Sequence, residues 1–107
     1  MSESSSAFRA LADGTRRQIL TLLRERPRTS GEIADQFSSS WPTISRHLAV
    51  LREADLVLAE RKGQEIYYEL NTSVFQDLVQ HLMEWGQPRE ARRKSARPTA
   101  ARRVREA

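Results

Sequence analysis

The chain has 107 residues, enough for one domain with a single modest core, and its 18 basic and 14 acidic side chains give a net charge of +4. It has no cysteine, which excludes disulfides, thiolate metal ligands and thiol catalysis and fits a reducing, cytoplasmic setting. It has neither an apolar run long enough to span a bilayer nor a signal-peptide pattern at its start, so we expect no membrane partner.

The charge is unevenly distributed along the chain. Residues 87–107 contain eight basic and two acidic residues, whereas residues 1–86 carry a net charge of −2. We therefore predict a folded domain over residues 1–86 and a basic, Arg/Ala-rich, disordered tail over residues 87–107. A basic balance suggests nucleic acid as a partner, and here that suggestion rests on the tail. The tail is either an electrostatic arm that raises affinity for nucleic acid or a solvated segment with no role. Phosphate contacts do not report base sequence, so it cannot select a site.

The first half of the chain predicts four helices. A short helix over residues 4–12 has Phe8 and Leu11 along one edge. Asp13 then caps an amphipathic helix of about three turns that Pro27 ends. The T-x-x-E spacing of Thr29 and Glu32 is a capping box for a short third helix.

The fourth predicted helix covers about residues 41–54. Ser40 can cap it, and Pro42 falls in its first turn, where a missing N–H is tolerated. Apolar residues at helical spacing form an inner seam: Ile44, Leu48 and Leu51. The outward row instead mixes an aromatic ring, two hydroxyls and a guanidinium: Trp41, Thr43, Ser45 and Arg46.

A change of period after residue 55 predicts a hairpin. Residues 56–61 and 65–70 are strand-like, and they flank a turn at Lys62-Gly63-Gln64. A last helix follows over about residues 74–86. The expected fold is therefore mainly α with a β-hairpin wing: a winged helix-turn-helix in the order α-α-α-α-β-β-α.

This constellation predicts a protein that binds double-stranded DNA. A major groove about 12 Å wide admits one helix, whose first residues reach base edges. Arg46 suits a guanine edge, Ser45 and Thr43 a base edge or a phosphate, and Trp41 a thymine methyl or a sugar. The short basic tip of the hairpin suits the backbone or the minor groove. The expected DNA-binding residues are Trp41, Pro42, Thr43, Ser45, Arg46, Arg61, Lys62 and Gln64.

The last helix has more large apolar residues than one face can bury, which predicts a partner helix. A two-fold dimer would use the same residues twice, whereas the alternative is a helix sunk in its own core. The expected interface residues are Phe8, Leu11, Phe75, Leu78, Val79, Leu82, Met83 and Trp85.

Four segments together resemble the ArsR family of winged-helix repressors, and most of all its SdpR-like autorepressor branch: DGTRRQILTLL, TSGEIADQF, PTISRHLAVLREADLV and ERKGQEIYYELN. The similarity spans about residues 7–85. It implies a homodimer joined by its first and last helices, with the fourth helix in the DNA groove. It also implies a cytoplasmic transcriptional repressor, often one acting on its own operon, with a pseudo-palindromic operator.

The resemblance also bears on metals. Many members of the family bind metals through a C-x-C pair in the third helix, and here that helix has no thiol. Others use Asp and His on the last helix, where this chain has Thr72, Val74, Trp85 and Pro88. We therefore expect no metal and no cofactor.

Other interpretations remain open at this stage. A winged helix can be a protein–protein adaptor, or a repressor gated by an unidentified small molecule. Trp41 could fold back over the turn as part of the core, and His47 could pack or cap instead of contacting a base. His81 has no partner ligand nearby in the sequence. No catalytic motif stands out, so we do not expect an enzyme.

Overall fold

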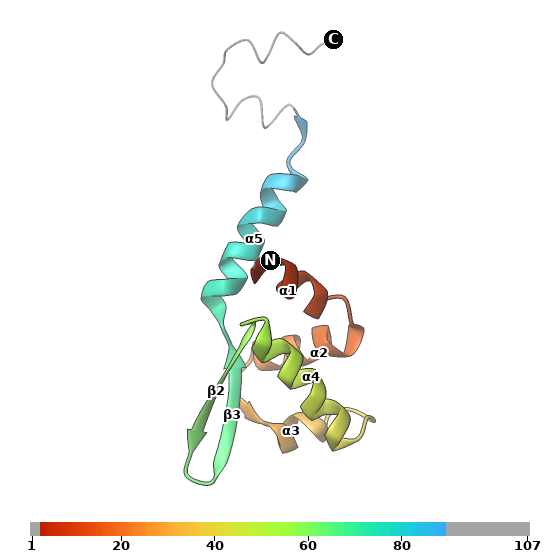
Figure 1. The fold of residues 1–107 in the computed structure, drawn as a ribbon, viewed down its shortest axis with the longest axis vertical. Helices are drawn as coiled ribbons and strands as arrows, with labels where there is room; N and C mark the ends of the chain where they lie inside the picture. Colours follow the sequence, from red (N-terminus) through yellow and green to blue (C-terminus); the bar gives the residue numbers. More distant parts are fainter. Residues whose placement is uncertain (1–2, 90–107) are drawn as a thin grey trace. The chain divides into compact units, whose positions relative to one another are not determined.

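The computed structural model describes residues 3–89 and confirms the predicted mainly helical architecture (Figure 1). The elements in chain order are α1 (Glu3–Ala10), α2 (Gly14–Leu23), β1 (Arg28–Thr29), α3 (Ser30–Ala34), α4 (Trp41–Glu53), β2 (Val57–Lys62), β3 (Glu65–Leu70) and α5 (Thr72–Gly86). Two compact units, residues 1–75 and 76–107, divide the chain within α5. The predicted tail from residue 90 onward lies outside the described residues.

The core of the first unit is built from the apolar faces that the sequence periodicity predicts. The largest fully buried side chains come from α2, α3, α4, the first residue of β2 and the residue before it: Ile19, Ile33, Ile44, Leu48, Leu51, Leu56 and Val57. Three of them form the predicted inner seam of α4. Burying that seam forces the remaining faces of α4 toward solvent or toward polar neighbours.

Side-chain caps fix where the helices of the first unit begin. Thr29 and Glu32 form the predicted capping box, since the Glu32 N–H donates to Thr29 Oγ1 at 3.1 Å and the Thr29 N–H donates to Glu32 Oε1 at 3.0 Å. Ser40 caps α4, its Oγ accepting from the Thr43 N–H at 3.4 Å. Asp13 caps α2. The start of the helix-turn-helix is thus set by local hydrogen bonds.

The sheet has three strands in the order β1-β3-β2, one more than the predicted hairpin. β2 and β3 pair antiparallel, and their turn has Gly63 at φ 66°, a left-handed conformation that glycine adopts at little cost. β1 pairs with Tyr67 and Tyr68 of β3. The sequence does not predict β1, because two residues are too few to show a period. Its pairing ties the base of the wing to the segment that leads into α3.

A buried arginine holds the connection between α2 and β1. Arg28 is only 9% exposed. Its Nη2 lies 2.8 Å from Glu25 Oε1, and its Nε donates to the Leu22 carbonyl at 3.4 Å. A buried guanidinium needs such partners because an unpaired charge away from water is strongly unfavourable.

The last helix, α5, carries exposed apolar side chains. Val79, Leu82, Met83 and Trp85 are 49%, 48%, 63% and 64% exposed, whereas Leu78 is buried. The His81 and Trp85 rings stack with their centroids 6.0 Å apart. Across residues 3–89, every helix is too short or too polar to cross a bilayer.

Candidate nucleic-acid interface

The first turns of α4 place two hydroxyl groups and a guanidinium at or near the surface. Ser45 and Arg46 are exposed, and Thr43 is half-buried, with its hydroxyl 3.0 Å from the Ser40 hydroxyl. The Arg46 guanidinium has no hydrogen bond or ion pair to another described residue. An unpaired, exposed guanidinium keeps its full set of donors for an external acceptor.

Trp41 folds back and still faces solvent. Its indole N–H donates to Ser30 Oγ at 3.2 Å, and its ring lies 3.6 Å from the place that a Cβ on Gly31 would occupy. With 57% of its surface exposed, Trp41 is not a core residue. It covers the start of α3 and presents an aromatic edge beside the first turn of α4.

The wing tip is basic only locally. Arg61, Lys62 and Gln64 are all exposed, but glutamates flank them in both strands. Arg61 Nη1 donates to the Gly63 carbonyl at 3.4 Å, and Lys62 Nζ lies 5.6 Å from the centroid of the Tyr67 ring. The two cations are thereby held near the turn.

An open groove joins the two surfaces. It encloses about 400 Å³ and is lined from one side by Ser30, Gly31 and Trp41 and from the other by residues 64–66 and Tyr68 of the wing. α3 and α4 lie beside the hairpin (Figure 1). The groove places hydroxyl groups and an aromatic ring between the start of α4 and β3.

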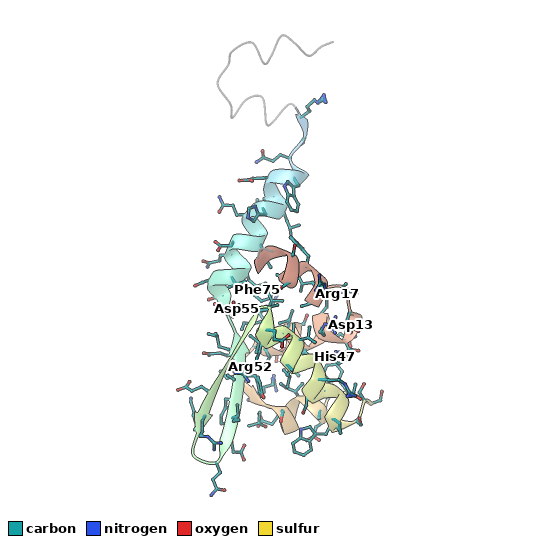
Figure 2. The ribbon with its side chains drawn as sticks, in the orientation of Figure 1. Asp13, Arg17, His47, Arg52, Asp55 and Phe75 are labelled. Carbon is teal, nitrogen blue, oxygen red and sulfur yellow. The ribbon has the colours of Figure 1, made fainter. Side chains whose placement is uncertain are left out.

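One polar contact links α4 to the turn between α1 and α2, and sequence reasoning does not find it. Arg16 Nη1 lies 3.3 Å from His47 Nδ1, across 31 residues of sequence. Asp13 lies at the same turn, and Figure 2 draws Asp13 and His47 close together. His47 is half-buried, as the packing interpretation expects. No local sequence signal could have paired these residues, because 31 positions separate them in the sequence.

Asp13 is the one described residue whose ionisation is clearly perturbed. The backbone N–H of Arg16 donates to its carboxylate at 3.2 Å and is the main cause of a pKa below the ordinary 3.8. Burial acts against this shift. The Thr15 N–H, at 2.8 Å, and the charges of His47 and Arg16 add to it. Residues 3–89 contain no cluster of three or more His, Asp or Glu side chains that could bind a metal ion.

The arrangement defines a class of protein. α3 and α4 form a helix-turn-helix, and the β2–β3 hairpin is its wing. Ser45 and Arg46 of α4 are exposed, and Trp41 at its start faces the wing across the groove. The chain is therefore of the winged helix-turn-helix class, whose members bind DNA.

Comparison with known proteins gives the family. The sequence pattern described as "Bacterial regulatory protein, arsR family" matches residues 13–58. The transcriptional repressor SdpR of Bacillus subtilis is 44% identical over 81 residues, which cover 76% of this chain and 90% of that protein. The chain belongs to the ArsR family of transcriptional regulators, as its sequence segments predicted.

Solved structures agree with this assignment. An ArsR-like transcriptional regulator from a Rhodococcus species superposes with a TM-score of 0.76 at 28% identity, covering 98% of this chain and 94% of that one. A homodimeric winged helix-turn-helix DNA-binding domain from Mycobacterium bovis, a possible ArsR-family regulator, superposes with a TM-score of 0.64 at 32% identity. That match covers 77% of this chain and 79% of the other.

Proposed function

We propose that this regulator is a cytoplasmic repressor that binds a pseudo-palindromic operator as a homodimer. The observation that carries the proposal is the exposed polar row at the start of α4, with the Arg46 guanidinium unpaired among the described residues. Repression is supported by the name of its relative SdpR, with which it is 44% identical. Action on its own operon follows from the same resemblance.

Sequence recognition in this proposal belongs to the first turns of α4. Arg46 donates two hydrogen bonds to a guanine edge, a contact that distinguishes guanine from the other bases. Ser45 and Thr43 contact a neighbouring base edge or a phosphate. Trp41 and Pro42, both exposed, lie against a sugar or a thymine methyl.

Backbone contacts belong to the wing and to the groove beside Trp41. Arg61, Lys62 and Gln64 meet phosphates or the minor groove of the same duplex. These contacts position the protein and strengthen binding to any sequence. Sequence preference therefore depends on α4, and the wing contributes to the salt dependence of binding.

Dimerisation is assigned to exposed apolar side chains of α5, with α1 and Phe75 contributing. Val79, Leu82, Met83 and Trp85 are each about half exposed or more, an unusual state for large apolar residues in a chain that acts alone. Phe8, Leu11 and Phe75 are half-buried. Leu78 is buried within the chain, so it belongs to the core more than to an interface.

The proposal includes no catalysis, metal or cofactor. The family is one of regulators, and the donor groups that its metal-sensing members use are replaced in this sequence. The open groove beside Trp41 is the place where a small molecule could compete with DNA. Effector control is thus the second candidate, and it predicts a ligand that releases DNA.

Selection from a pool of random duplexes tests the proposed function. We expect repeated rounds with the full chain to enrich a sequence with two related half-sites about one helical turn apart, since a two-fold dimer presents two copies of α4. A transcription assay with that sequence between promoter and reporter then separates repression from activation. Enrichment of no sequence would contradict DNA recognition and favour the protein–protein adaptor.

A further inference from the structure

Arg16 binds three groups from two other elements with a single side chain. Its Nε donates to the Ala10 carbonyl at 2.7 Å, its Nη2 donates to the Arg9 carbonyl at 3.4 Å, and its Nη1 lies 3.3 Å from His47 Nδ1. The two carbonyls belong to the last turn of α1, where a helix has fewer backbone donors for its acceptors, and the Arg9 carbonyl also accepts from the Ala12 N–H at 3.1 Å. The side chain therefore joins the end of α1 to the middle of α4.

The contact with His47 has a defined chemical direction. A guanidinium has only N–H donors, so this hydrogen bond requires a neutral His47 whose Nδ1 accepts and whose proton is on Nε2. Arg16 and Asp13 are the charged groups that act on this ring from α2 and its cap. The pair is directional, unlike the apolar contacts of Ile44 and Leu48 on the same helix.

The position of His47 on α4 gives the contact its consequence. His47 follows Ser45 and Arg46 directly, and it is half-buried whereas they are exposed. Successive residues of an α-helix are turned by about 100° around its axis. Fixing the rotation of the helix at His47 therefore fixes the direction in which the Cα–Cβ bond of Arg46 leaves it. Apolar packing tolerates a small rotation of α4, but a directional hydrogen bond opposes it.

We infer that Arg16 is a positioning residue for DNA recognition: through His47 it sets the rotation of α4 and so the direction of Arg46. This inference rests on the proposed function, since it concerns the accuracy with which α4 meets base edges. Arg16 itself contacts no base in this scheme. Its effect is on the preference for the selected duplex over random DNA, because a rotated α4 still meets phosphates.

Arg17 is a matched control. It is the next residue on α2, it has the same charge, and its Nη1 donates to the Leu11 carbonyl at 2.8 Å at the same turn. Of these two arginines, Arg16 is the one whose side chain also contacts α4, through His47. Arg16→Gln and Arg17→Gln thus remove equal charge together with bonds to backbone carbonyls, two for Arg16 and one for Arg17, but only the first removes the contact with His47.

The experiment measures binding of both variants to the selected and to a random duplex at one salt concentration. We expect Arg16→Gln to lower the ratio of selected to random affinity about tenfold, the scale of one charge-assisted hydrogen bond. Arg17→Gln should change that ratio less than about twofold. Equal falls for both variants, or a fall of Arg16→Gln on random DNA as large as on selected DNA, would mean direct phosphate contact and overturn the inference.

Variants of His47 keep the test decisive if Arg16→Gln fails to fold. His47→Asn retains an acceptor near the position of Nδ1, whereas His47→Leu removes it. We expect the first to keep the preference for the selected duplex and the second to lose it. Equal behaviour of the two variants would contradict the inference.

A measurement without DNA separates this inference from the proposed function. Hydrogen exchange of the α4 amides should be faster in Arg16→Gln than in Arg17→Gln, because the first variant removes one of the anchors of α4. If the parent chain selects no sequence, the proposed function fails. The exchange rates then still decide whether Arg16 holds α4, and unchanged rates would reject it.

Discussion

Arg46 is available for recognition because its guanidinium forms no hydrogen bond or ion pair with another described residue. It lies in the second turn of α4, beyond the Ser40 cap, with the seam of α4 turned inward. We expect Arg46→Ala to weaken binding to the selected duplex by roughly 1–3 kcal/mol, the range for a bidentate contact to guanine. Affinity for random DNA should change less. Anisotropy titrations with both duplexes at fixed salt measure the difference.

Arg52 provides the control for Arg46. It is exposed like Arg46 and carries the same charge, but it lies in the last turn of α4, at the end remote from the cap (Figure 2). Arg52→Ala should therefore leave the preference for the selected duplex unchanged. Equal loss of preference in both variants would contradict the assignment of base recognition to the start of α4.

Among the described residues other than glycine, Asp55 alone has a left-handed backbone conformation, with φ at 61°. It ends α4 in a Schellman motif, in which the Leu56 N–H donates to the Leu51 carbonyl at 3.0 Å and the Asp55 N–H donates to the Arg52 carbonyl at 2.9 Å. Glycine adopts this conformation without a Cβ clash, so we expect Asp55→Gly to stabilise the fold by about 0.5–1 kcal/mol. Urea unfolding followed by circular dichroism measures the change.

Gly63 gives the opposite case for the same measurement. Its φ of 66° is also left-handed, and open space surrounds the position of an added Cβ. Gly63→Ala should destabilise by about 1 kcal/mol through backbone strain alone. A loss of stability in Asp55→Gly would show that the carboxylate contributes more than the strain it accompanies.

At the scale of elements, the Asp13 cap makes the stability of α2 depend on pH. The carboxylate accepts from two N–H groups of the first turn, and these bonds lower its pKa below 3.8. A lowered pKa means that the stabilisation is complete above the unfolded value and is lost as the pH falls through the folded one. We expect Asp13→Ala to be less stable than the parent chain at pH 7, with the difference shrinking below pH 3.8.

Thermal unfolding of both chains from about pH 2.5 to neutral pH measures this dependence. Asp13→Asn is the control, since asparagine also caps helices but does not titrate. It should remain close to the parent chain near neutral pH and show a weaker acid dependence. A difference between Asp13→Ala and the parent chain that is constant with pH would mean that the carboxylate charge has no part in the cap.

The elements that the sequence predicted are those with a local signal. Capping residues at Asp13, Thr29 and Ser40 and the helical spacing of apolar residues located α2, α3 and α4. β1 has no such signal, since its two residues become a strand only by pairing with β3. The same holds for Arg28, whose burial depends on how the chain returns from α2.

The candidate site divides in the same way. Exposure of Ser45 and Arg46 followed from the period of α4 and could be predicted. The fold-back of Trp41 could not, because it depends on the bare backbone of Gly31 on another helix. The link between Arg16 and His47 spans 31 residues and depends on packing that no window of sequence contains.

At the scale of the whole molecule, the charge distribution separates two contributions to DNA binding. Residues 87–107 have a net charge of +6, whereas the domain is slightly acidic. We propose that deletion of residues 88–107 lowers the salt dependence of binding, by about 0.9 in the logarithmic slope for each phosphate that the tail neutralises. The selected sequence should stay the same, since contacts to phosphates carry no information on base sequence. Selection repeated with the shortened chain checks this, and a changed consensus would reject the arm interpretation.

Assembly is the last property that belongs to the whole molecule. Leu82 and Met83 of α5 are 48% and 63% exposed, and a stable dimer buries about 1,600 Å² in total. We expect Leu82→Glu or Met83→Glu to give monomers in light scattering, because a two-fold interface would bury the new charge twice without a partner. Gln80→Glu adds the same charge at an exposed polar position of α5 and should remain dimeric.

Leu78 is unsuitable for this test, because a charge at a buried position disturbs folding before it disturbs assembly. Dissociation of the dimer should also lower operator affinity far more than affinity for random DNA. A monomer places one α4 on DNA, so it forgoes the second half-site and with it the gain from binding two linked sites. Monomers that bind the full operator as tightly as the parent chain would contradict recognition by paired copies of α4.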